Sequence, residues 1–145
     1  MQKQKTTLPL ILLAGDAAIL LLVTLAGFAR HGELGSAGLR LLSTFVPLCT
    51  AWALIAPFVG VYDKDSLADL WQLWRPPLAA LLAAPMAGWL RGLWLGADII
   101  PVFVLVIAGF TALGMLAWRL AWALWARRQA RLQARLLAKR QGSDG

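Results

Sequence analysis

The sequence contains four long apolar runs separated by short polar breaks, and this recurrence constrains the fold more than any other feature. A transmembrane helix needs about 20 mainly apolar residues to cross a hydrocarbon core of roughly 30 Å. Inside a bilayer the backbone polar groups must be bonded within the chain, which helices achieve. With 60% hydrophobic and 14% charged residues, the composition excludes a soluble domain. We therefore expect an all-α, polytopic membrane protein.

The polar breaks predict where the helices lie. Residues 1–125 are expected to form a transmembrane bundle with short loops, built from helices at about 8–29, 39–62, 74–94 and 99–125. A short interfacial helix, capped by Asp65 or Ser66, is expected between the second and third spans. Beyond Trp125, basic residues alternate with Ala and Leu, so residues 126–145 are predicted to continue the last helix as a basic cytoplasmic tail.

Lysine and arginine are distributed unevenly between the two ends of this predicted bundle. Eleven of the 14 basic residues fall at the end that carries both termini, and the other three are Arg30, Arg40 and Arg91. Basic residues collect on the cytoplasmic side of membrane proteins. We therefore expect a multi-pass protein of the cell (inner) membrane with both termini in the cytoplasm. Because the positive charges flank apolar runs, lipid is the expected partner, and nucleic acid is not.

Asp16 is the most informative single residue, because it lies near the middle of the first span with apolar residues on both sides. An unpaired carboxylate there costs about 2.5–3.5 kcal/mol on insertion scales. We expect Asp16 to face the bundle and to pair with Arg75 or Arg119, which makes the three residues a candidate intramembrane charge or ion site. Two interpretations stay open: a proton or cation site, and a polar clamp between the first helix and the third or fourth.

A second group of polar residues is predicted at the end opposite the termini. Its members are Arg30, His31, Glu33, Arg91 and Asp98. They could converge into an anion or lipid-headgroup site in which the histidine titrates near neutral pH, or they could be ordinary solvated loop residues. With one histidine and one cysteine in the chain, we expect no metal site, and we find no catalytic residues and no cofactor motif.

The tail carries a regular series of basic residues. They are Arg127, Arg128, Arg131, Arg135 and Lys139. Four of the five recur at four-residue spacing and form a basic ridge on a helix, for which anionic lipid headgroups are the expected partner.

The third predicted helix has a face of small residues at four-residue spacing. This face comprises Ala79, Ala80, Ala83, Ala84, Ala87, Gly88 and Gly92. Small residues let membrane helices approach closely. Ala14 with Ala18, and Ala108 with Ala112, offer matching surfaces on the first and fourth helices. Spacing leaves open whether such surfaces meet within one chain or between chains, as in a homodimer.

Several short motifs, in this order and spacing, resemble an uncharacterised prokaryotic family of small four-helix membrane proteins, domain of unknown function 3054. The motifs are Gly15-Asp16, Arg30-His31, Pro47, the Pro85 to Gly92 segment, Pro101-Val102-Phe103-Val104 and Trp118-Arg119. The resemblance covers the chain from Leu13 to about Arg119. It implies the fold and the membrane location, but no activity is established for the family.

Three classes of function remain after these observations. The first is a small transporter or channel-like protein with a charged site around Asp16. The alternative is a non-catalytic structural or accessory subunit that packs against a membrane partner. A membrane enzyme acting on lipid would need an acid, base or metal cluster on one face, and the sequence shows only fragments of one. We therefore expect no enzymatic activity.

Overall fold

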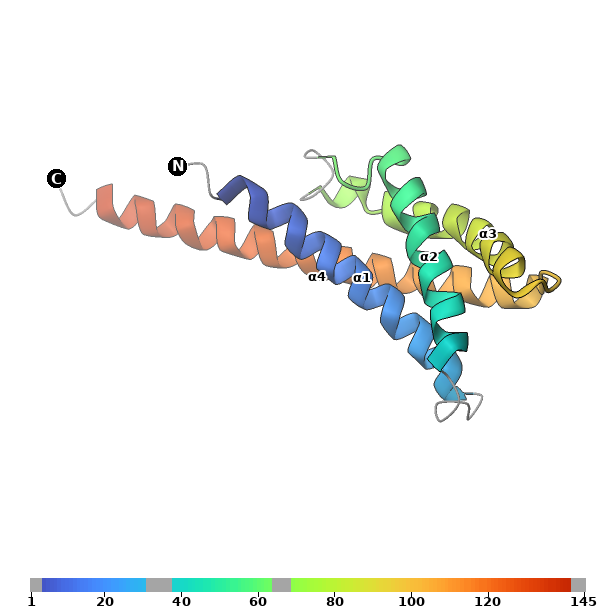
Figure 1. The fold of residues 1–145 in the computed structure, drawn as a ribbon. Coiled ribbons are helices and arrows are strands. Elements are labelled where there is room, and N and C mark those ends of the chain that lie inside the picture. Colours follow the sequence, from blue (N-terminus) through green and yellow to red (C-terminus); the bar gives the residue numbers. More distant parts are fainter. Residues whose placement is uncertain (1–3, 31–37, 64–68, 142–145) are drawn as a thin grey trace.

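The computed structural model describes residues 4–30, 38–63 and 69–141, and helices dominate these segments (Figure 1). The elements, in chain order, are α1 (Gln4–Arg30), α2 (Gly38–Phe58), the short 3₁₀ helix η3 (Leu70–Gln72), α3 (Arg75–Leu95) and α4 (Pro101–Gln141). Within the described segments, four helical stretches are long and apolar enough to cross a membrane. The predicted all-α class with four membrane-spanning helices is confirmed.

α2 is shorter than the sequence predicts, because it ends at Phe58 rather than near Tyr62. Gly60 adopts the left-handed conformation, with φ of 72°. The amide of Gly60 donates to the carbonyl of Pro57, and that of Val61 donates to Ala56. This pair of bonds is the Schellman motif, in which a left-handed glycine closes a helix and redirects the chain. The turn brings Tyr62 back toward the bundle.

A short helix precedes α3. The short helix η3 is capped by Asp69, whose carboxylate accepts a hydrogen bond from the amide of Trp71 at 3.0 Å. The capping residues predicted from the sequence, Asp65 and Ser66, lie outside the described residues. The cap is therefore assigned to the aspartate that directly precedes the helix.

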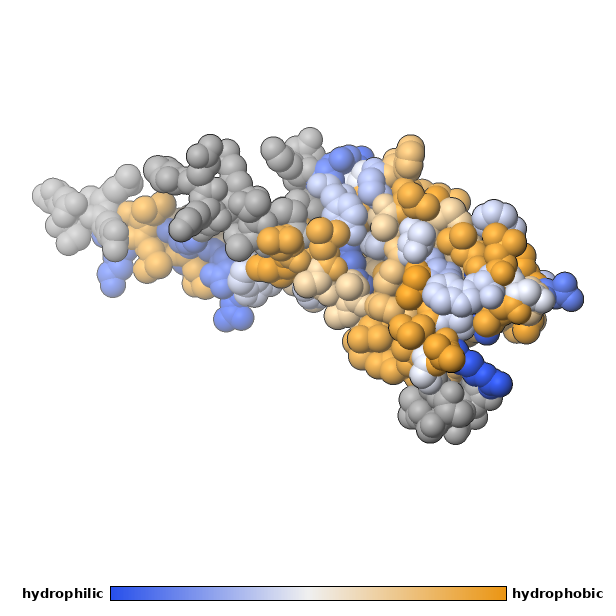
Figure 2. All heavy atoms as spheres, viewed as in Figure 1, coloured by the Kyte–Doolittle hydropathy of each residue, from blue (hydrophilic) through white to orange (hydrophobic). Residues whose placement is uncertain are grey.

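α4 is an unbroken helix of 41 residues. At 1.5 Å per residue it is about 60 Å long, roughly twice the thickness of a hydrocarbon core. Its basic continuation extends past the rest of the bundle on the side where the chain begins (Figure 1). Figure 2 shows the same division, with apolar side chains covering much of the bundle and hydrophilic ones gathering along this extension.

The four long helices pack as a ring in which each contacts the helices before and after it. α3 packs most extensively, against α2 and α4, while α1 makes smaller contacts with α4 and α2. Consecutive helices run in opposite directions. We call the end where α1 begins and α2 finishes the terminal end of the bundle, and the end where α2 begins and α3 finishes the far end.

The small-residue face of α3 explains its central position. All five alanines of the predicted face are buried. Four of them, all except Ala84, belong to a core cluster that also contains Leu48, Trp52 and Met115. Because lipid chains are as apolar as the core, close approach of small residues supplies much of the association energy. On α1, by contrast, Ala14 and Ala18 are exposed and do not serve packing within this chain.

Candidate functional site

Asp16 lies on the face of α1 that is turned into the bundle. Leu12, Leu20 and Thr24, spaced at four-residue intervals around it, are also buried, so the face is continuous over more than three turns. Asp16 is 1% exposed, and its Oδ2 accepts a hydrogen bond from Nη2 of Arg119 at 2.7 Å. Arg119, on α4, is 5% exposed. The two charges therefore neutralise each other inside the protein.

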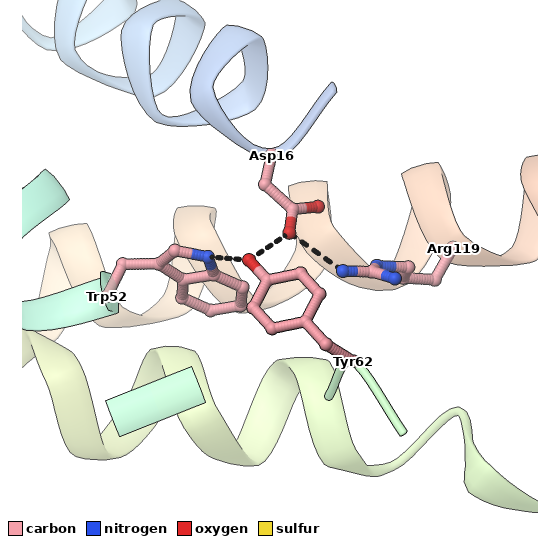
Figure 3. Close-up of polar contacts among 4 residues, drawn as sticks. All are labelled: Asp16, Trp52, Tyr62 and Arg119. Atoms are coloured by element: carbon pink, nitrogen blue, oxygen red, sulfur yellow. Dashed lines mark hydrogen bonds and ion pairs between the residues drawn. The ribbon is translucent and has the colours of Figure 1, made fainter. Parts of the chain in front are cut away.

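Tyr62 completes the environment of the aspartate (Figure 3). Its hydroxyl donates to Oδ2 of Asp16 at 2.7 Å and accepts a hydrogen bond from the Trp52 indole at 2.9 Å. The Arg119 guanidinium lies over the Tyr62 ring, 5.3 Å from its centre. The four side chains come from α1, α2, the turn after α2 and α4, and we call them the Asp16 cluster. One polar network thus connects three of the four long helices.

Gly15 brings α1 and α4 close together beside this network. The indole of Trp118 lies directly against Gly15, so that a β-carbon there would overlap the ring. Because glycine has no side chain, the Trp118 indole can pack against the backbone of α1 at this position. The resulting contact between α1 and α4 places Arg119 opposite Asp16. Two of the motifs that carry the family resemblance, Gly15-Asp16 and Trp118-Arg119, meet in this contact.

Three buried polar atoms, two in the Asp16 cluster and one on the adjoining Trp118, have no hydrogen-bond partner among the described residues. They are Oδ1 of Asp16, Nε of Arg119 and Nε1 of Trp118. Buried polar groups of this kind are commonly satisfied by a bound water. Oδ2 of Asp16 already accepts hydrogen bonds from two donors. A further polar partner would therefore have to be small and to bind at Oδ1.

Arg75 does not join the Asp16 cluster. Its Nη1 donates to Oδ2 of Asp63 and to the carbonyl of Gly60, each at 2.9 Å, at the terminal end of the bundle. The structure thus pairs Asp16 with only one of its two candidate partners. The turn at Gly60 accounts for this, because it presents a carbonyl and a carboxylate to Arg75 close to the start of α3.

The polar residues predicted at the far end are only partly described. The side chain of Arg30 and all of His31 and Glu33 lie outside the described part of the structure. Asp98 is exposed. Arg91 is half-buried, its Nε donates to Oγ1 of Thr44 at 3.2 Å, and within the described residues no hydrogen bond or ion pair joins it to Asp98. The described residues therefore do not bring the predicted cluster together, and Arg91 faces α2 instead.

The basic residues of the tail lie on the exposed extension of α4. Arg127, Arg128, Arg131, Arg135 and Lys139 are all exposed. Within the described segments, no group of three or more His, Cys, Asp or Glu side chains lies close enough to hold a metal ion.

Sequence reasoning missed Tyr62 and Trp52 as members of the site. Trp52 is distinctive because it lies in the middle of a span, where an indole N–H needs a hydrogen-bond partner. Tyr62 is the one tyrosine of the sequence. Both residues are distinctive in the sequence, but their contact depends on the turn at Gly60, which the sequence did not predict.

Comparison with protein-family models gives one match, over residues 13–122. The matching family is DUF3054, which is described as a protein of unknown function. This chain belongs to the DUF3054 family. The match covers most of the chain and confirms the family that the motifs suggested. It includes all four members of the Asp16 cluster and ends before the basic extension of α4. No curated protein and no solved structure gives a significant match to this DUF3054 member.

Proposed function

We propose that this protein is a non-catalytic, multi-pass membrane protein in which the Asp16 cluster is a structural clamp, and that it serves as an accessory subunit to a membrane partner. The observation that carries the proposal is the pairing of Asp16 with Arg119. A cation-binding carboxylate needs a negative charge that is open to the ion. Here a guanidinium at 2.7 Å already supplies the countercharge, and Tyr62 donates to the same oxygen.

The surface of α1 supports the accessory role. Ala14 and Ala18 are exposed on α1, and small residues at this spacing suit close approach by another membrane helix. The partner is either a second copy of this chain or a different membrane protein. Crosslinking in native membranes should trap one partner reproducibly under this proposal, and recovery of the uncrosslinked chain alone would count against it.

The same proposal includes the membrane in which the protein lies and the side of that membrane on which its termini lie. The excess of basic residues at the terminal end favours the cell (inner) membrane with both termini in the cytoplasm. On a straight helix, Arg127, Arg128 and Arg131 lie within about 9 Å of Trp125, whereas Lys139 lies about 21 Å beyond it. Since charges are screened over about 8 Å at physiological salt, the first three arginines are the ones placed to attract anionic headgroups.

A transporter or channel-like function is the second candidate, and one observation favours it. Oδ1 of Asp16 is buried without a protein partner, as a group that accepts a proton or coordinates an ion would be. Arg119 would then have to release the carboxylate during each cycle.

The Asp16→Asn variant separates the two candidates. For a clamp, the variant should lose about 3–5 kcal/mol of unfolding free energy in detergent, because the shape is kept but the charge of Arg119 stays buried without its countercharge. Reconstituted vesicles of wild-type protein should show no cation-dependent flux. A wild-type flux that disappears in a normally stable Asp16→Asn protein would establish transport and overturn the clamp.

A further inference from the structure

The last part of α4 carries large apolar side chains outside the apolar bundle. α4 continues without a break to Gln141, and its final segment extends past the other helices (Figure 1). Leu132, Leu136 and Leu137 are exposed on this segment. A segment with this many basic residues does not lie in hydrocarbon, so the three leucines face water. Their burial against another molecule is therefore favourable.

Two of these leucines share a face of the helix with two of the basic residues. At about 100° per residue, an arc of about 100° contains Leu132, Arg135, Leu136 and Lys139. We call these four residues the distal face, and all four are exposed. Leu137 points to nearly the opposite side of the helix. The distal face thus presents an apolar pair beside a basic pair, each at four-residue spacing.

The basic residues of this segment repel one another. Arg131, Arg135 and Lys139 follow at four-residue spacing, and the sequence from Ala126 to Gln141 contains no Asp or Glu. Like charges at this spacing are neighbours on a helix and weaken it. Acidic groups on a bound partner would relieve the repulsion, and the exposure of all three side chains leaves them accessible to such groups. The charge of the distal face therefore selects an acidic partner.

Membrane lipid and a second copy of the chain fit this face less well. On a straight helix, Arg135 and Lys139 lie roughly 15 and 21 Å beyond Trp125, whereas charge is screened over about 8 Å at physiological salt. Headgroups at the level of Trp125 are therefore too distant to attract them strongly. The same segment of a second copy would bring the same positive charges and be repelled. An acidic helix with an apolar row complements both the charge and the leucines.

We propose that the distal face binds an acidic, amphipathic helix of the membrane partner, on the side of the membrane that the terminal end of the bundle faces. Carboxylates of that helix pair with Arg135 and Lys139, and its apolar row covers Leu132 and Leu136. The inference names the chemistry of the partner, so it deepens the accessory role proposed above and rests on it. It does not depend on the Asp16 cluster.

A synthetic peptide added to the full chain in an uncharged detergent tests the chemistry of the face. The probe is a fluorescent helical peptide with one row of glutamates and an adjacent row of leucines, both at four-residue spacing. A control peptide has the same composition in scrambled order. By fluorescence anisotropy, the wild-type protein should bind the patterned peptide at least about tenfold more tightly than the scrambled one. Equal affinities would show attraction between charges alone and would overturn the proposal.

Two adjacent leucines supply a matched pair of variants. Leu136 is 63% exposed and Leu137 is 62% exposed, but only Leu136 belongs to the distal face. Leu136→Gln should weaken binding of the patterned peptide about tenfold, whereas Leu137→Gln should leave it unchanged. Glutamine is a good helix former, so both variants should keep the helix, which circular dichroism checks. Equal effects of the two changes would remove the distal face from the binding site.

The position of the charge is tested at constant net charge. Arg135→Gln should weaken binding of the patterned peptide about threefold, as expected for an exposed ion pair. Adding Gln133→Arg to that variant restores the net charge about 160° away around the helix, and it should not restore binding. Recovery of wild-type affinity would mean that only the total charge matters, which would contradict the proposal.

The membrane itself is the competing occupant. In nanodiscs, the patterned peptide should bind the protein whether the lipid is phosphatidylglycerol or phosphatidylcholine. Binding that is lost only in phosphatidylglycerol would show that the distal face lies on anionic lipid, and it would overturn the proposal.

Crosslinking in native membranes separates this inference from the accessory role. A zero-length reagent that joins amines to carboxylates should connect Lys139 to an aspartate or glutamate in a helical segment of the partner, as identified by mass spectrometry. A partner that is trapped reproducibly, but only through other parts of this chain, would contradict the inference and leave the accessory role intact. Failure of every crosslinker to trap a partner would contradict the accessory role itself.

Discussion

The Asp16–Arg119 and Asp63–Arg75 pairs have nearly the same geometry but very different surroundings. Their N–O distances are 2.7 and 2.9 Å. The Asp16 and Arg119 side chains are 1% and 6% exposed, whereas those of Asp63 and Arg75 are 63% and 24% exposed. The first pair joins α1 to α4 inside the apolar core, and the second joins the turn after α2 to the start of α3.

The difference shows why distance alone does not measure the importance of an ion pair. Breaking a buried pair leaves a charge in a medium that cannot solvate it, which typically costs about 3–5 kcal/mol. Water solvates the remaining charge of an exposed pair, so the loss there is usually below about 1 kcal/mol. The same chemical contact is therefore expected to stabilise the fold strongly at Asp16 and only slightly at Asp63.

The largest effect is expected from Arg119→Gln. The change leaves the Asp16 carboxylate without a countercharge inside the bundle, and it should lower the unfolding free energy by about 3–5 kcal/mol. Denaturation in mixed detergent micelles, followed by circular dichroism, measures the loss. Arg75→Gln is the matched control at the exposed pair. A loss no larger than that of the control would contradict the clamp.

Gly15→Ala should have the next largest effect, although it changes no charge. The added methyl group overlaps the Trp118 ring, and the resulting separation of α1 from α4 should cost about 1–3 kcal/mol. Gly27→Ala adds the same group to the same helix, where no atom lies within 4 Å, and should be nearly neutral. Equal melting temperatures for the two variants would show that the contact between Gly15 and Trp118 does not position the pair.

Tyr62→Phe tests whether the rest of the Asp16 cluster supports the pair. The variant removes the hydroxyl that donates to Asp16 and accepts from Trp52, so it should cost about 1 kcal/mol. The effect should shrink when Asp16 is already replaced by Asn, since the hydroxyl then donates to a neutral amide oxygen and the charge-assisted bond is already lost. Fully additive losses in the double variant would instead mean that Tyr62 acts independently of the aspartate.

The smallest effect is expected from Asp63→Asn, at less than about 1 kcal/mol. Because this pair is exposed, the difference from wild type should decrease further when salt is raised to about 1 M, where the Debye length is about 3 Å. The loss caused by Arg119→Gln should hardly respond to salt. A salt-sensitive Arg119→Gln variant would mean that water reaches the Asp16 pair.

The sequence predicted the helices well because the bilayer imposes a requirement on length and polarity that can be read directly from the apolar runs. It left the partner of Asp16 open between Arg75 and Arg119. The physical reason is that helices surrounded by lipid are apolar on every side, so no amphipathic stripe indicates which face turns inward. In the structure Gly15 packs against Trp118 and Ile19 lies against Gly114, and in this packing of α1 on α4 Arg119 faces Asp16.

The end of α2 shows a second limit of sequence reasoning. The apolar run continues through Val59 and Val61, so hydropathy alone extends the helix to Tyr62. The helix stops at Phe58 because Gly60 takes a left-handed conformation and closes a Schellman motif. This turn also carries Tyr62 into the Asp16 cluster and gives Arg75 its own partners.

A pair of double-mutant cycles in detergent tests the central claim most directly. One cycle combines Asp16→Asn with Arg119→Gln, and the other combines Asp63→Asn with Arg75→Gln, with unfolding free energies measured for each single and double variant. The clamp predicts a coupling energy of about 2 kcal/mol or more for the buried pair and less than about 1 kcal/mol for the exposed pair. A coupling near zero between Asp16 and Arg119 would contradict the account.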